Sequence, residues 1–368
     1  MTDFSAHYMA HALRLARQGR FSTHPNPRVG CVIVSTSGEI IGEGWHVRAG
    51  EPYAEVHALR AAGERARGAT AYVTLEPCSH YGRTPPCADA LIHAGVAQVV
   101  VAMQDPNPQV AGRGLERLRA AGIRVNCGLL EAEARALNVG FIKRMEQGLP
   151  WVRVKLAMSL DGRTAMASGE SQWITGPDAR AAVQRLRAES SAIISGADTV
   201  LFDNARLTVR PAELGVSDEQ AALAAQRPPL RVLVDGQQRV PLTAAFFQAG
   251  VACVATTQAP MHAYAEAGHR VLHMATAEGR VDLRALLHAL AAEGCNDVLV
   301  EAGPRLAGAF AQAGLVDEYH FFMAPQLLGS SARPLLEWPL SRMADAPQLH
   351  IREVRAVGRD WRIIATPA

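Results

Sequence analysis

Two cysteines and one glutamate in the first half of the chain are of the types that carry out metal-assisted hydrolysis. Cys78 ends the segment Glu76-Pro77-Cys78, and Cys87 follows after eight intervening residues. In hydrolytic deamination, two cysteine thiolates and a histidine hold zinc, and the metal lowers the pKa of a bound water. A glutamate beside the metal moves a proton from that water to the departing amine. Glu55, at the start of a predicted helix, is the candidate for this catalytic role.

A structural role is the alternative for each of these residues. Free cysteines commonly behave as small core residues, and the helix dipole stabilises a carboxylate in the first turn of a helix. Cys87, however, ends the segment Gly82-Arg83-Thr84-Pro85-Pro86-Cys87, which is polar and stiffened by proline. Such a segment does not suit a core, and together with Glu76-Pro77-Cys78 and Ala54-Glu55 it favours a metal site.

The second half has two segments that suit a ligand site. A strand that includes Lys155 runs into a turn at Asp161-Gly162, and a polar segment follows over 168–175. Farther along, a buried strand ends at Gly303 and a helix begins at Pro304, which leaves backbone amides free to hold a phosphate. This segment lacks the Gly-x-Gly-x-x-Gly fingerprint. A strand and helix packed through small residues is therefore the alternative.

The elements that position these segments alternate between helix and strand, which predicts an α/β fold with helices on both faces of a sheet. A break at Gly148-Leu149-Pro150 predicts a boundary between a domain of residues 1–147 and a domain of residues 151–368. In the first half we expect helices over 4–19, 55–67, 88–94, 113–121 and 131–147, a hairpin of 29–34 and 39–44, and strands over 71–75 and 96–103. In the second half we expect strands over 151–158, 192–195, 230–234, 251–256, 297–300 and 318–324, and helices over 177–189, 282–293 and 304–313.

Composition restricts the class of partner. The 368 residues carry 37 Lys+Arg against 35 Asp+Glu, a net charge of +2, and only 5% are aromatic. A deaminase that acts on nucleic-acid bases needs a basic or aromatic surface for the strand, so we expect no nucleic-acid partner. The chain has no run of 18 apolar residues and no secretory signal, so we expect no membrane partner. Six cysteines are sparse for this length, and we expect a reducing, cytoplasmic location.

The two halves together resemble the bifunctional deaminase/reductase of riboflavin biosynthesis over essentially the whole chain. In the first half the matching segments are His24-Pro25-Asn26-Pro27-Arg28-Val29-Gly30, Ala54-Glu55-Val56-His57-Ala58-Leu59, and Thr74-Leu75-Glu76-Pro77-Cys78-Ser79-His80 running on to Cys87. Most zinc deaminases place two residues between the cysteines, whereas this family places eight. In the second half the matching segments begin at Lys155, Ser168 and Val298.

The resemblance implies a cytidine-deaminase-like three-layer domain, followed by a dihydrofolate-reductase-like domain that uses NADPH. By position, it implies substrate contacts from Asn26, His46, His80, Arg83, Ser171, Arg187, Leu207, Arg210 and Glu301. It implies cofactor contacts from Ala157, Trp173, Thr199, Asp203, Gly303, Pro304, Arg305, Leu306, Ala307, Gly308 and Ala309. Arg187 and Arg210 suit a substrate phosphate, although a surface role is the alternative for both. Glu301 and Lys155 are the candidates for the acid of the reduction.

One position departs from the family pattern. Tyr53 stands where the family has its zinc-binding histidine, two residues before Glu55. A phenol, with an unperturbed pKa near 10, is a poor zinc ligand at neutral pH. His57 lies one helical turn farther on and can point the same way, so the third metal ligand is either Tyr53 or His57. We expect weakened zinc binding and weakened deamination.

The activity implied is hydrolytic deamination of 2,5-diamino-6-(5-phosphoribosylamino)pyrimidinone, followed by reduction of its ribosyl group to ribityl with NADPH. The expected partners are therefore small phosphorylated pyrimidines, and we expect a homo-oligomer. The alternative is a monofunctional reductase whose first domain has lost its metal because of Tyr53.

Overall fold

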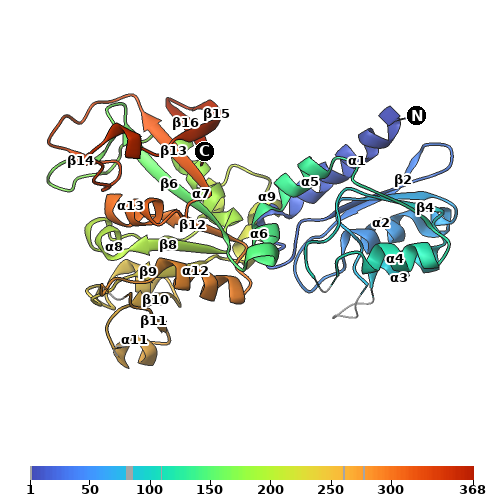
Figure 1. Cartoon of the computed structure of the whole chain (residues 1–368), viewed down its shortest axis with the longest axis horizontal. Coiled ribbons are helices and arrows are strands. Elements are labelled where there is room, and N and C mark those ends of the chain that lie inside the picture. Colours follow the sequence, from blue (N-terminus) through green and yellow to red (C-terminus); the bar gives the residue numbers. More distant parts are fainter. Residues whose placement is uncertain (1, 80–85, 109, 260–261, 277) are drawn as a thin grey trace. The chain divides into compact units, whose positions relative to one another are not determined.

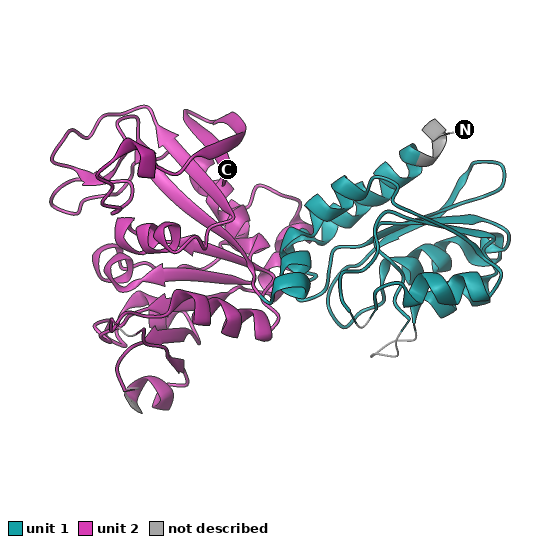
Figure 2. Ribbon diagram, viewed as in Figure 1, with its two compact units in different colours: residues 1–148 teal, residues 149–368 magenta. Residues whose placement is uncertain are grey.

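The computed structural model describes residues 2–79, 86–108, 110–259, 262–276 and 278–368, and these form two compact units, residues 1–148 and 149–368 (Figure 2). Each unit has its own sheet and its own buried core. The break between the units coincides with Gly148, which ends the preceding helix in a left-handed conformation.

Unit 1 is built on a sheet whose described strands run in the order β2-β1-β3-β4-β5. The β1–β2 hairpin predicted from the sequence is confirmed as antiparallel, and β3, β4 and β5 run parallel. The strands are β1 (Gly30–Val34), β2 (Ile40–Trp45), β3 (Thr70–Val73), β4 (Gln98–Val101) and β5 (Arg124–Cys127). The helices are α1 (Thr2–Ala16), α2 (Ala54–Ala62), α3 (Cys87–Ala94), α4 (Arg113–Ala120), α5 (Glu131–Leu137) and α6 (Val139–Gln147).

Glycines let helices pack tightly on both faces of this sheet. A Cβ at Gly30 of β1 would lie 2.0 Å from the Ala12 carbonyl oxygen of α1. A Cβ at Gly42 of β2 would lie 2.2 Å from the Ala58 carbonyl oxygen of α2. Gly30 and Gly42 point to opposite faces, because Gly42 pairs with Ile33, three residues along β1 from Gly30. The result is a three-layer arrangement with α1 on one face and α2 and α3 on the other (Figure 1).

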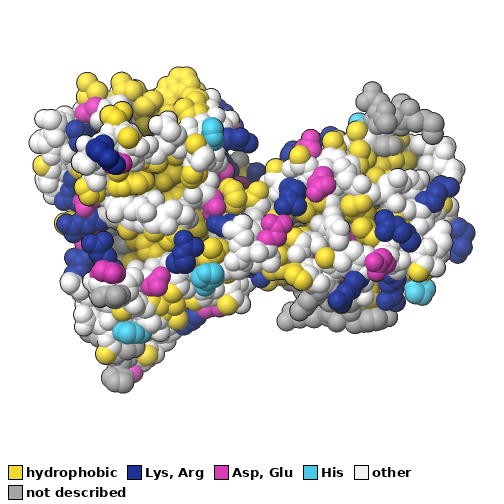
Figure 3. Space-filling model, viewed as in Figure 1, with side chains coloured by type: hydrophobic (Ala, Val, Ile, Leu, Met, Phe, Trp, Pro, Cys, Tyr) yellow, Lys and Arg dark blue, Asp and Glu magenta, His cyan; other side chains and the backbone are white. Residues whose placement is uncertain are grey.

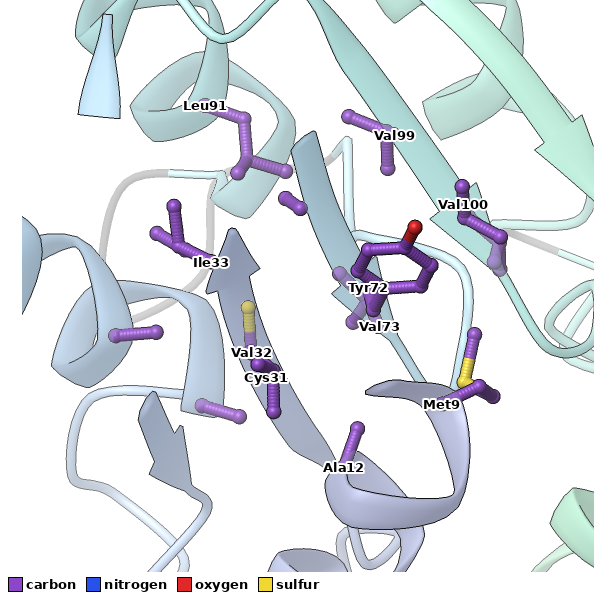
Figure 4. Close-up of a cluster of buried hydrophobic side chains, with 14 of the residues drawn as sticks. Met9, Ala12, Cys31, Val32, Ile33, Tyr72, Val73, Leu91, Val99 and Val100 are labelled. Atoms are coloured by element: carbon purple, nitrogen blue, oxygen red, sulfur yellow. The ribbon is translucent and has the colours of Figure 1, made fainter. Parts of the chain in front are cut away.

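The core of unit 1 lies between β1, β3 and β4 and these helices (Figure 4). It is built from aliphatic side chains with few large aromatics, consistent with the small residues that let the helices approach. Labelled members in Figure 4 are Met9, Ala12, Cys31, Val32, Ile33, Tyr72, Val73, Leu91, Val99 and Val100.

The single helix predicted over 131–147 is wrong. Asn138 interrupts the helix and separates α5 from α6. The Asn138 side chain forms hydrogen bonds with the backbone of Arg28. The Asn138 Oδ1 atom accepts the Arg28 N–H at 2.8 Å, and the Asn138 Nδ2 atom donates to the Arg28 carbonyl at 2.9 Å. A side chain that pairs with a distant backbone segment competes with helix continuation in a way that periodicity does not reveal.

Unit 2 is built on a sheet whose described strands run in the order β11-β10-β9-β8-β12-β6-β13-β16-β15. All neighbours from β11 to β13 are parallel, and β13, β16 and β15 pair antiparallel. The strands are β6 (Trp151–Ser159), β8 (Ala192–Gly196), β9 (Leu230–Val234), β10 (Cys253–Thr256), β11 (Arg270–His273), β12 (Asp297–Glu301), β13 (Glu318–Ala324), β15 (Leu349–Val357) and β16 (Asp360–Pro367). Two short strands, β7 (Arg163–Ala165) and β14 (Arg333–Pro334), pair separately.

Helices cover both faces of this sheet as well. They are α7 (Pro177–Glu189), α8 (Ala197–Asp203), α9 (Asp218–Gln226), α10 (Ala245–Gln248), α11 (His262–Glu266), α12 (Leu283–Ala292) and α13 (Pro304–Gln312). Apolar residues of α12 and α13 pack with alternate strand residues such as Val154 and Val300. Residues of α7 pack on Leu299 and Phe322, which point to the other face. The carboxyl ends of the parallel strands share one edge of the sheet, where open α/β sheets bind their ligands.

Candidate active sites of the two units

The candidate metal site of unit 1 lies where two helices begin. Tyr53 is the residue immediately before α2, Glu55 is in the first turn of α2, and Cys87 is the first residue of α3. The Cys87 N–H donates to the Cys78 Sγ atom at 3.3 Å, and the two thiols are hydrogen-bond partners. The structure therefore brings Cys78 and Cys87 together, and it places Glu55 within hydrogen-bonding distance of Cys87.

Glu55 is a buried carboxyl with one oxygen unused. It is 2% exposed, and its Oε2 atom has no hydrogen-bond partner among the described residues. Burial raises the pKa of Glu55 to about 7, against the opposing effect of hydrogen bonds to its own backbone and to Cys87. A carboxyl with a pKa near neutrality both accepts and gives up a proton readily, which suits a proton shuttle.

Tyr53 is held against His46. The two rings stack with centroids 4.4 Å apart and an interplanar angle of 10°. Burial raises the pKa of the Tyr53 phenol above its usual value, and the neighbouring negative charges of Cys78, Cys87 and Glu55 raise it further. The phenol therefore lies close to both thiols, but it is kept in its protonated form and is a poor metal ligand.

His57 does not complete a metal site with the two thiols. It lies near His46, whose pKa is lowered chiefly by burial and in part by the charge of His57. The Nε2 atom of His57 is buried without a hydrogen-bond partner in the described part of the chain. Over those same residues, no three His, Cys, Asp or Glu side chains are grouped so that they could hold a metal ion.

Two further predicted substrate residues lie beside Tyr53. The Asn26 Nδ2 atom is 3.1 Å from the Nε2 atom of His46, and His46 is fully buried. The structure thus brings Asn26, His46 and Tyr53 into one group. His80 and Arg83 lie outside the described residues.

Glu76 has a structural task that sequence reasoning did not identify. Its carboxylate accepts backbone N–H groups from Asp105 at 3.1 Å and Gly112 at 2.9 Å on one oxygen, and from Gly114 at 2.9 Å and Leu115 at 3.3 Å on the other. These bonds hold the start of α4 against the segment that carries Cys78. The cue available in the sequence was a glutamate in an otherwise apolar stretch at the end of a strand.

The candidate site of unit 2 is centred on a largely buried ion pair at the carboxyl ends of parallel strands. Glu301, the last residue of β12, pairs with Arg187 of α7 through two hydrogen bonds of 2.7 and 2.8 Å. Arg187 also donates to the carbonyl of Thr208 at 2.9 Å. Burial by itself raises the pKa of Glu301, but Arg187, and then Lys155 and Arg210, lower it to about 2. Glu301 is therefore a fixed negative charge near neutral pH.

Lys155 lies next to this pair on the neighbouring strand. It is the register partner of Glu301 in β12 and of His320 in β13. Burial lowers the pKa of the Lys155 amine, against the effect of the Glu301 charge, and Arg187 lowers it further. Asp203 is close enough to act on Lys155 as well, and it accepts a hydrogen bond of 3.0 Å from the Ser171 hydroxyl. The site thus gathers predicted cofactor and substrate residues around one buried amine.

The predicted phosphate-binding turn has the geometry of an open helix N-terminus. Gly303 precedes α13, Pro304 is its first residue, and no side chain caps the helix. The Gly303 N–H donates to the Thr199 hydroxyl at 3.1 Å, which joins the starts of α8 and α13. A Cβ at Gly303 would meet only that hydroxyl within 4 Å, at 3.9 Å. The described residues thus leave the backbone at Gly303 uncrowded, as we expect of a phosphate-binding turn.

The remaining predicted residues of unit 2 are distributed between this site, the surface and the core. Arg305 is 74% exposed, Trp173 is 63% exposed beneath Arg180, and Ala157, Leu306 and Ala309 are half-buried. Ala307 and Gly308 are buried, and a Cβ at Gly308 would lie 2.4 Å from the Glu337 carbonyl oxygen. The Leu207 side chain is in the core, which leaves only its backbone for a ligand. Arg210 is half exposed and pairs with Glu213.

Comparison with known proteins gives matches over both units. The protein-family model described as "Cytidine and deoxycytidylate deaminase zinc-binding region" matches residues 3–103. The family model of the RibD C-terminal domain matches residues 150–363. The riboflavin biosynthesis protein RibD of Escherichia coli is 58% identical over 360 residues, which cover 96% of this chain and 97% of that protein. RibD of Haemophilus influenzae is 48% identical over 377 residues, covering 100% and 99% of the two chains.

Solved structures agree with these matches. Acinetobacter baumannii RibD, form 1, has a TM-score of 0.92 at 46% identity and covers both chains completely. A diaminohydroxyphosphoribosylaminopyrimidine deaminase/5-amino-6-(5-phosphoribosylamino)uracil reductase from Thermotoga maritima has a TM-score of 0.85 at 32% identity and covers 99% of each chain. The predicted fold, a cytidine-deaminase-like domain followed by a dihydrofolate-reductase-like domain, is confirmed. The chain therefore belongs to the RibD family of riboflavin biosynthesis enzymes.

Proposed function

We propose that this chain catalyses two successive steps of riboflavin biosynthesis with two separate sites. The first step is hydrolytic deamination of 2,5-diamino-6-(5-phosphoribosylamino)pyrimidinone, and the second is NADPH-dependent reduction of the ribosyl group to ribityl. The observation that carries this proposal is the pair of buried carboxyls, Glu55 beside two thiols and Glu301 beside Arg187 and Lys155. Both family regions are present in the chain, and nothing in the comparisons favours the monofunctional alternative.

We assign deamination to residues 1–147 and reduction to residues 151–368. The assignment is supported by the division into compact units after residue 148 and by the spans of the two family matches. No helix in the described part of the chain is long and apolar enough to cross a membrane. A cytoplasmic location is the proposal that the small number of cysteines, six in 368 residues, supports.

In the deaminase site, Glu55 is the proton shuttle. Its Oε2 atom, which has no hydrogen-bond partner in the described part of the chain, takes a proton from the attacking water and delivers it to the departing amine. Asn26 and His46 contact the pyrimidine substrate, and His80 and Arg83 are assigned to the same substrate by their sequence positions. Because Glu55 is buried and has a pKa of about 7, it passes through both protonation states at neutral pH.

Zinc is the metal of the matched family region, and the residues of this chain fit it only in part. Cys78 and Cys87 are two neighbouring thiols of the kind that zinc binds. The third position holds Tyr53, whose protonated phenol does not fit, and His57 lies beside His46. The chain therefore holds zinc with fewer good ligands than the family pattern provides, and deamination is the weaker of its two activities.

In the reductase site, NADPH supplies the hydride when it is bound, and the protein positions substrate and cofactor. The amides at the start of α13 hold a cofactor phosphate, together with Thr199. Glu301 stays ionised and accepts hydrogen bonds from the sugar hydroxyls, so it is not the acid. Lys155 is then the proton donor, and Arg210 binds the substrate phosphate while Arg187 fixes Glu301.

Two single substitutions in the full chain test the assignment of two sites. Glu55→Gln abolishes ammonia release and leaves oxidation of NADPH by the deaminated substrate unchanged. Glu301→Gln abolishes NADPH oxidation and leaves ammonia release unchanged. Loss of both activities in either variant, with the fold intact by circular dichroism, contradicts the assignment.

We also propose that a second copy of the chain covers the β15–β16 hairpin. β15 is an edge strand, and Ile351, Val354 and Trp361 of the hairpin are 64%, 54% and 46% exposed. Hydrophobic side chains gather at the end of unit 2 that carries this hairpin (Figure 3). An edge strand with apolar side chains is a template for pairing with another chain. Light scattering of Ile351→Glu tests this, because the variant remains monomeric where the unchanged chain is a dimer.

A further inference from the structure

We propose that Cys78 and Cys87 are a modification site, at which a small disulfide such as oxidised glutathione converts the two thiols into an intramolecular disulfide when no metal is bound. The proposal goes beyond the two activities assigned above. It depends on the geometry of the thiols and on the ligand at the third metal position, and it holds whatever the rate of deamination.

The backbone holds the two sulfurs together without a metal. Cys78 accepts two hydrogen bonds from the first turn of α3: its Sγ atom from the Cys87 N–H at 3.3 Å, and its carbonyl from the Ala88 N–H at 3.1 Å. The side chains of Cys78 and Cys87 are themselves hydrogen-bond partners. These contacts fix Cys78 against the start of the helix that carries Cys87. Loss of a metal therefore leaves the sulfurs as neighbours, which disulfide formation requires.

The two cysteines also differ in access. Cys78 is half-buried, whereas Cys87 is 1% exposed. The more accessible Cys78 is therefore the thiol that a small disulfide reaches first, and Cys87 is the one that resolves the mixed disulfide. Cys31, Cys253 and Cys295 are buried, and Cys127 is exposed on β5. Among the described residues, no other two cysteines are hydrogen-bonded to each other.

The residue at position 53 makes this pair unusually available for oxidation. A metal held by thiolates competes with oxidation, because the same sulfur electrons bind the metal. In this chain the third position holds the phenol of Tyr53, which is stacked on His46. The two thiols therefore spend more time without metal than they would beside a histidine ligand.

The exchange balances in two steps. The Cys78 thiolate attacks one sulfur of oxidised glutathione, the disulfide bond of glutathione breaks, and one glutathione thiolate leaves. The Cys87 thiolate then attacks the Cys78 sulfur of the mixed disulfide, and a second glutathione thiolate leaves. The two protein thiols lose two electrons, one small disulfide gains them, and the two thiol protons pass to the released glutathione. Zinc has then lost both of its good ligands in unit 1.

The test uses the full chain, treated with chelator and shown by metal analysis to be free of zinc, and then exposed to oxidised glutathione. We expect loss of two titratable thiols, and peptide mapping without reductant that joins Cys78 to Cys87. Dithiothreitol reverses the change. Zinc-loaded Tyr53→His forms the same disulfide at least about tenfold more slowly. NADPH oxidation, measured on the same samples, is unchanged and reports separately on the proposed function.

Two variants distinguish the pair from other thiols. Cys127→Ser removes the exposed cysteine and keeps the two-thiol loss. Cys87→Ser stops the reaction at a glutathione adduct on Cys78. The proposal is overturned if only Cys127 reacts, if the zinc-free chain keeps both thiols, if zinc-loaded Tyr53→His reacts as fast as the zinc-free chain, or if chelator does not remove zinc from the unchanged chain.

Discussion

The two units each bury one glutamate at the centre of a site, and the surroundings give the two carboxyls opposite properties. Glu55 in unit 1 has one oxygen without a hydrogen-bond partner among the described residues, and burial raises its pKa to about 7. Glu301 in unit 2 accepts two hydrogen bonds from the Arg187 guanidinium, and the pKa of Glu301 falls to about 2. Environments that separate the pKa values of similar groups commonly assign them different roles. Here one carboxyl is suited to moving a proton, and the other is a permanent charge.

The two sites also differ in whether their polar groups have partners. In unit 2, Arg187 and Glu301 are already paired with each other, and no side chain caps α13 at Gly303. Among the described residues of unit 1, Glu55 Oε2 and His57 Nε2 have no hydrogen-bond partner, and Tyr53 lies where we expect the third metal ligand. We therefore expect the site of unit 2 to work without a metal, and the site of unit 1 to depend on a metal ligand that Tyr53 supplies poorly.

The largest expected effect is that of Glu55→Gln. We expect ammonia release to fall by at least about two orders of magnitude, because the amide cannot shuttle a proton. Zinc content and reduction stay unchanged. Glu51→Gln, a change at a partly exposed neighbour paired with Arg48, is the matched control and keeps full activity. Loss of zinc in Glu55→Gln would show that Glu55 is itself a ligand and would overturn its assigned role.

Next in size is the effect of removing the partner of Glu301. We expect Arg187→Met to lower the free energy of unfolding of unit 2 by about 3 kcal/mol, because a buried charge loses its partner. Urea unfolding followed by tryptophan fluorescence measures this. Arg210→Met, which breaks a half-exposed pair with Glu213, should change the free energy by less than about 1 kcal/mol. Equal effects of the two substitutions would contradict a larger contribution of the Arg187–Glu301 pair to stability.

A smaller effect is expected from the substrate phosphate. Arg210→Ala should raise the KM of the reductase for its substrate by roughly tenfold with little change in kcat, because a phosphate contact contributes equally to ground and transition states. Arg284→Ala, at an exposed position of α12, is the control. An unchanged KM in Arg210→Ala would remove this residue from the site.

A further expected effect is the pH dependence of the stability of unit 2. Glu301 and Glu318 both have a pKa of about 2 in the folded chain, below the value near 4.3 of an unfolded glutamate. Between these values the unfolded state binds more protons, so stability is full above about pH 5 and falls as the pH decreases toward 2. Glu318, whose pKa is lowered first by its hydrogen bond with His320 and then by Arg153 at 3.2 Å, accounts for part of this loss. Urea unfolding at several pH values should therefore give a flatter profile for Glu318→Gln, and an identical profile would contradict the assignment.

Much of the fold could be predicted from local patterns. The alternation in Val152, Val154 and Leu156 gave β6, and Pro304 after Gly303 marked the start of α13. The apolar periodicity did not reveal the division of α5 from α6, because the Asn138 side chain forms hydrogen bonds with the backbone of Arg28, 110 residues earlier. β15 and β16 were also missed. β15 is an edge strand that is exposed on both faces, so it lacks the alternation that identifies a half-buried strand.

The candidate sites also contain residues that local motifs predict and residues that only the folded chain brings together. Cysteine spacing and the position of Glu55 were visible in the sequence, because metal sites are built from short motifs. The bidentate pair of Arg187 and Glu301 joins residues 114 positions apart, so no local sequence pattern predicts it. Arg333 was missed for the same reason: it acts on Asp203 and lies over the Phe202 ring at 5.0 Å, far from both in the sequence.

The central claim, that the third ligand position limits unit 1 alone, is tested most directly by zinc analysis of Tyr53→His beside the unchanged chain. We expect the unchanged chain to hold well below one zinc and the variant to hold about one per chain, with faster ammonia release and the same rate of NADPH oxidation. A stoichiometric zinc content in the unchanged chain, with no gain of zinc or deamination in Tyr53→His, would contradict the claim.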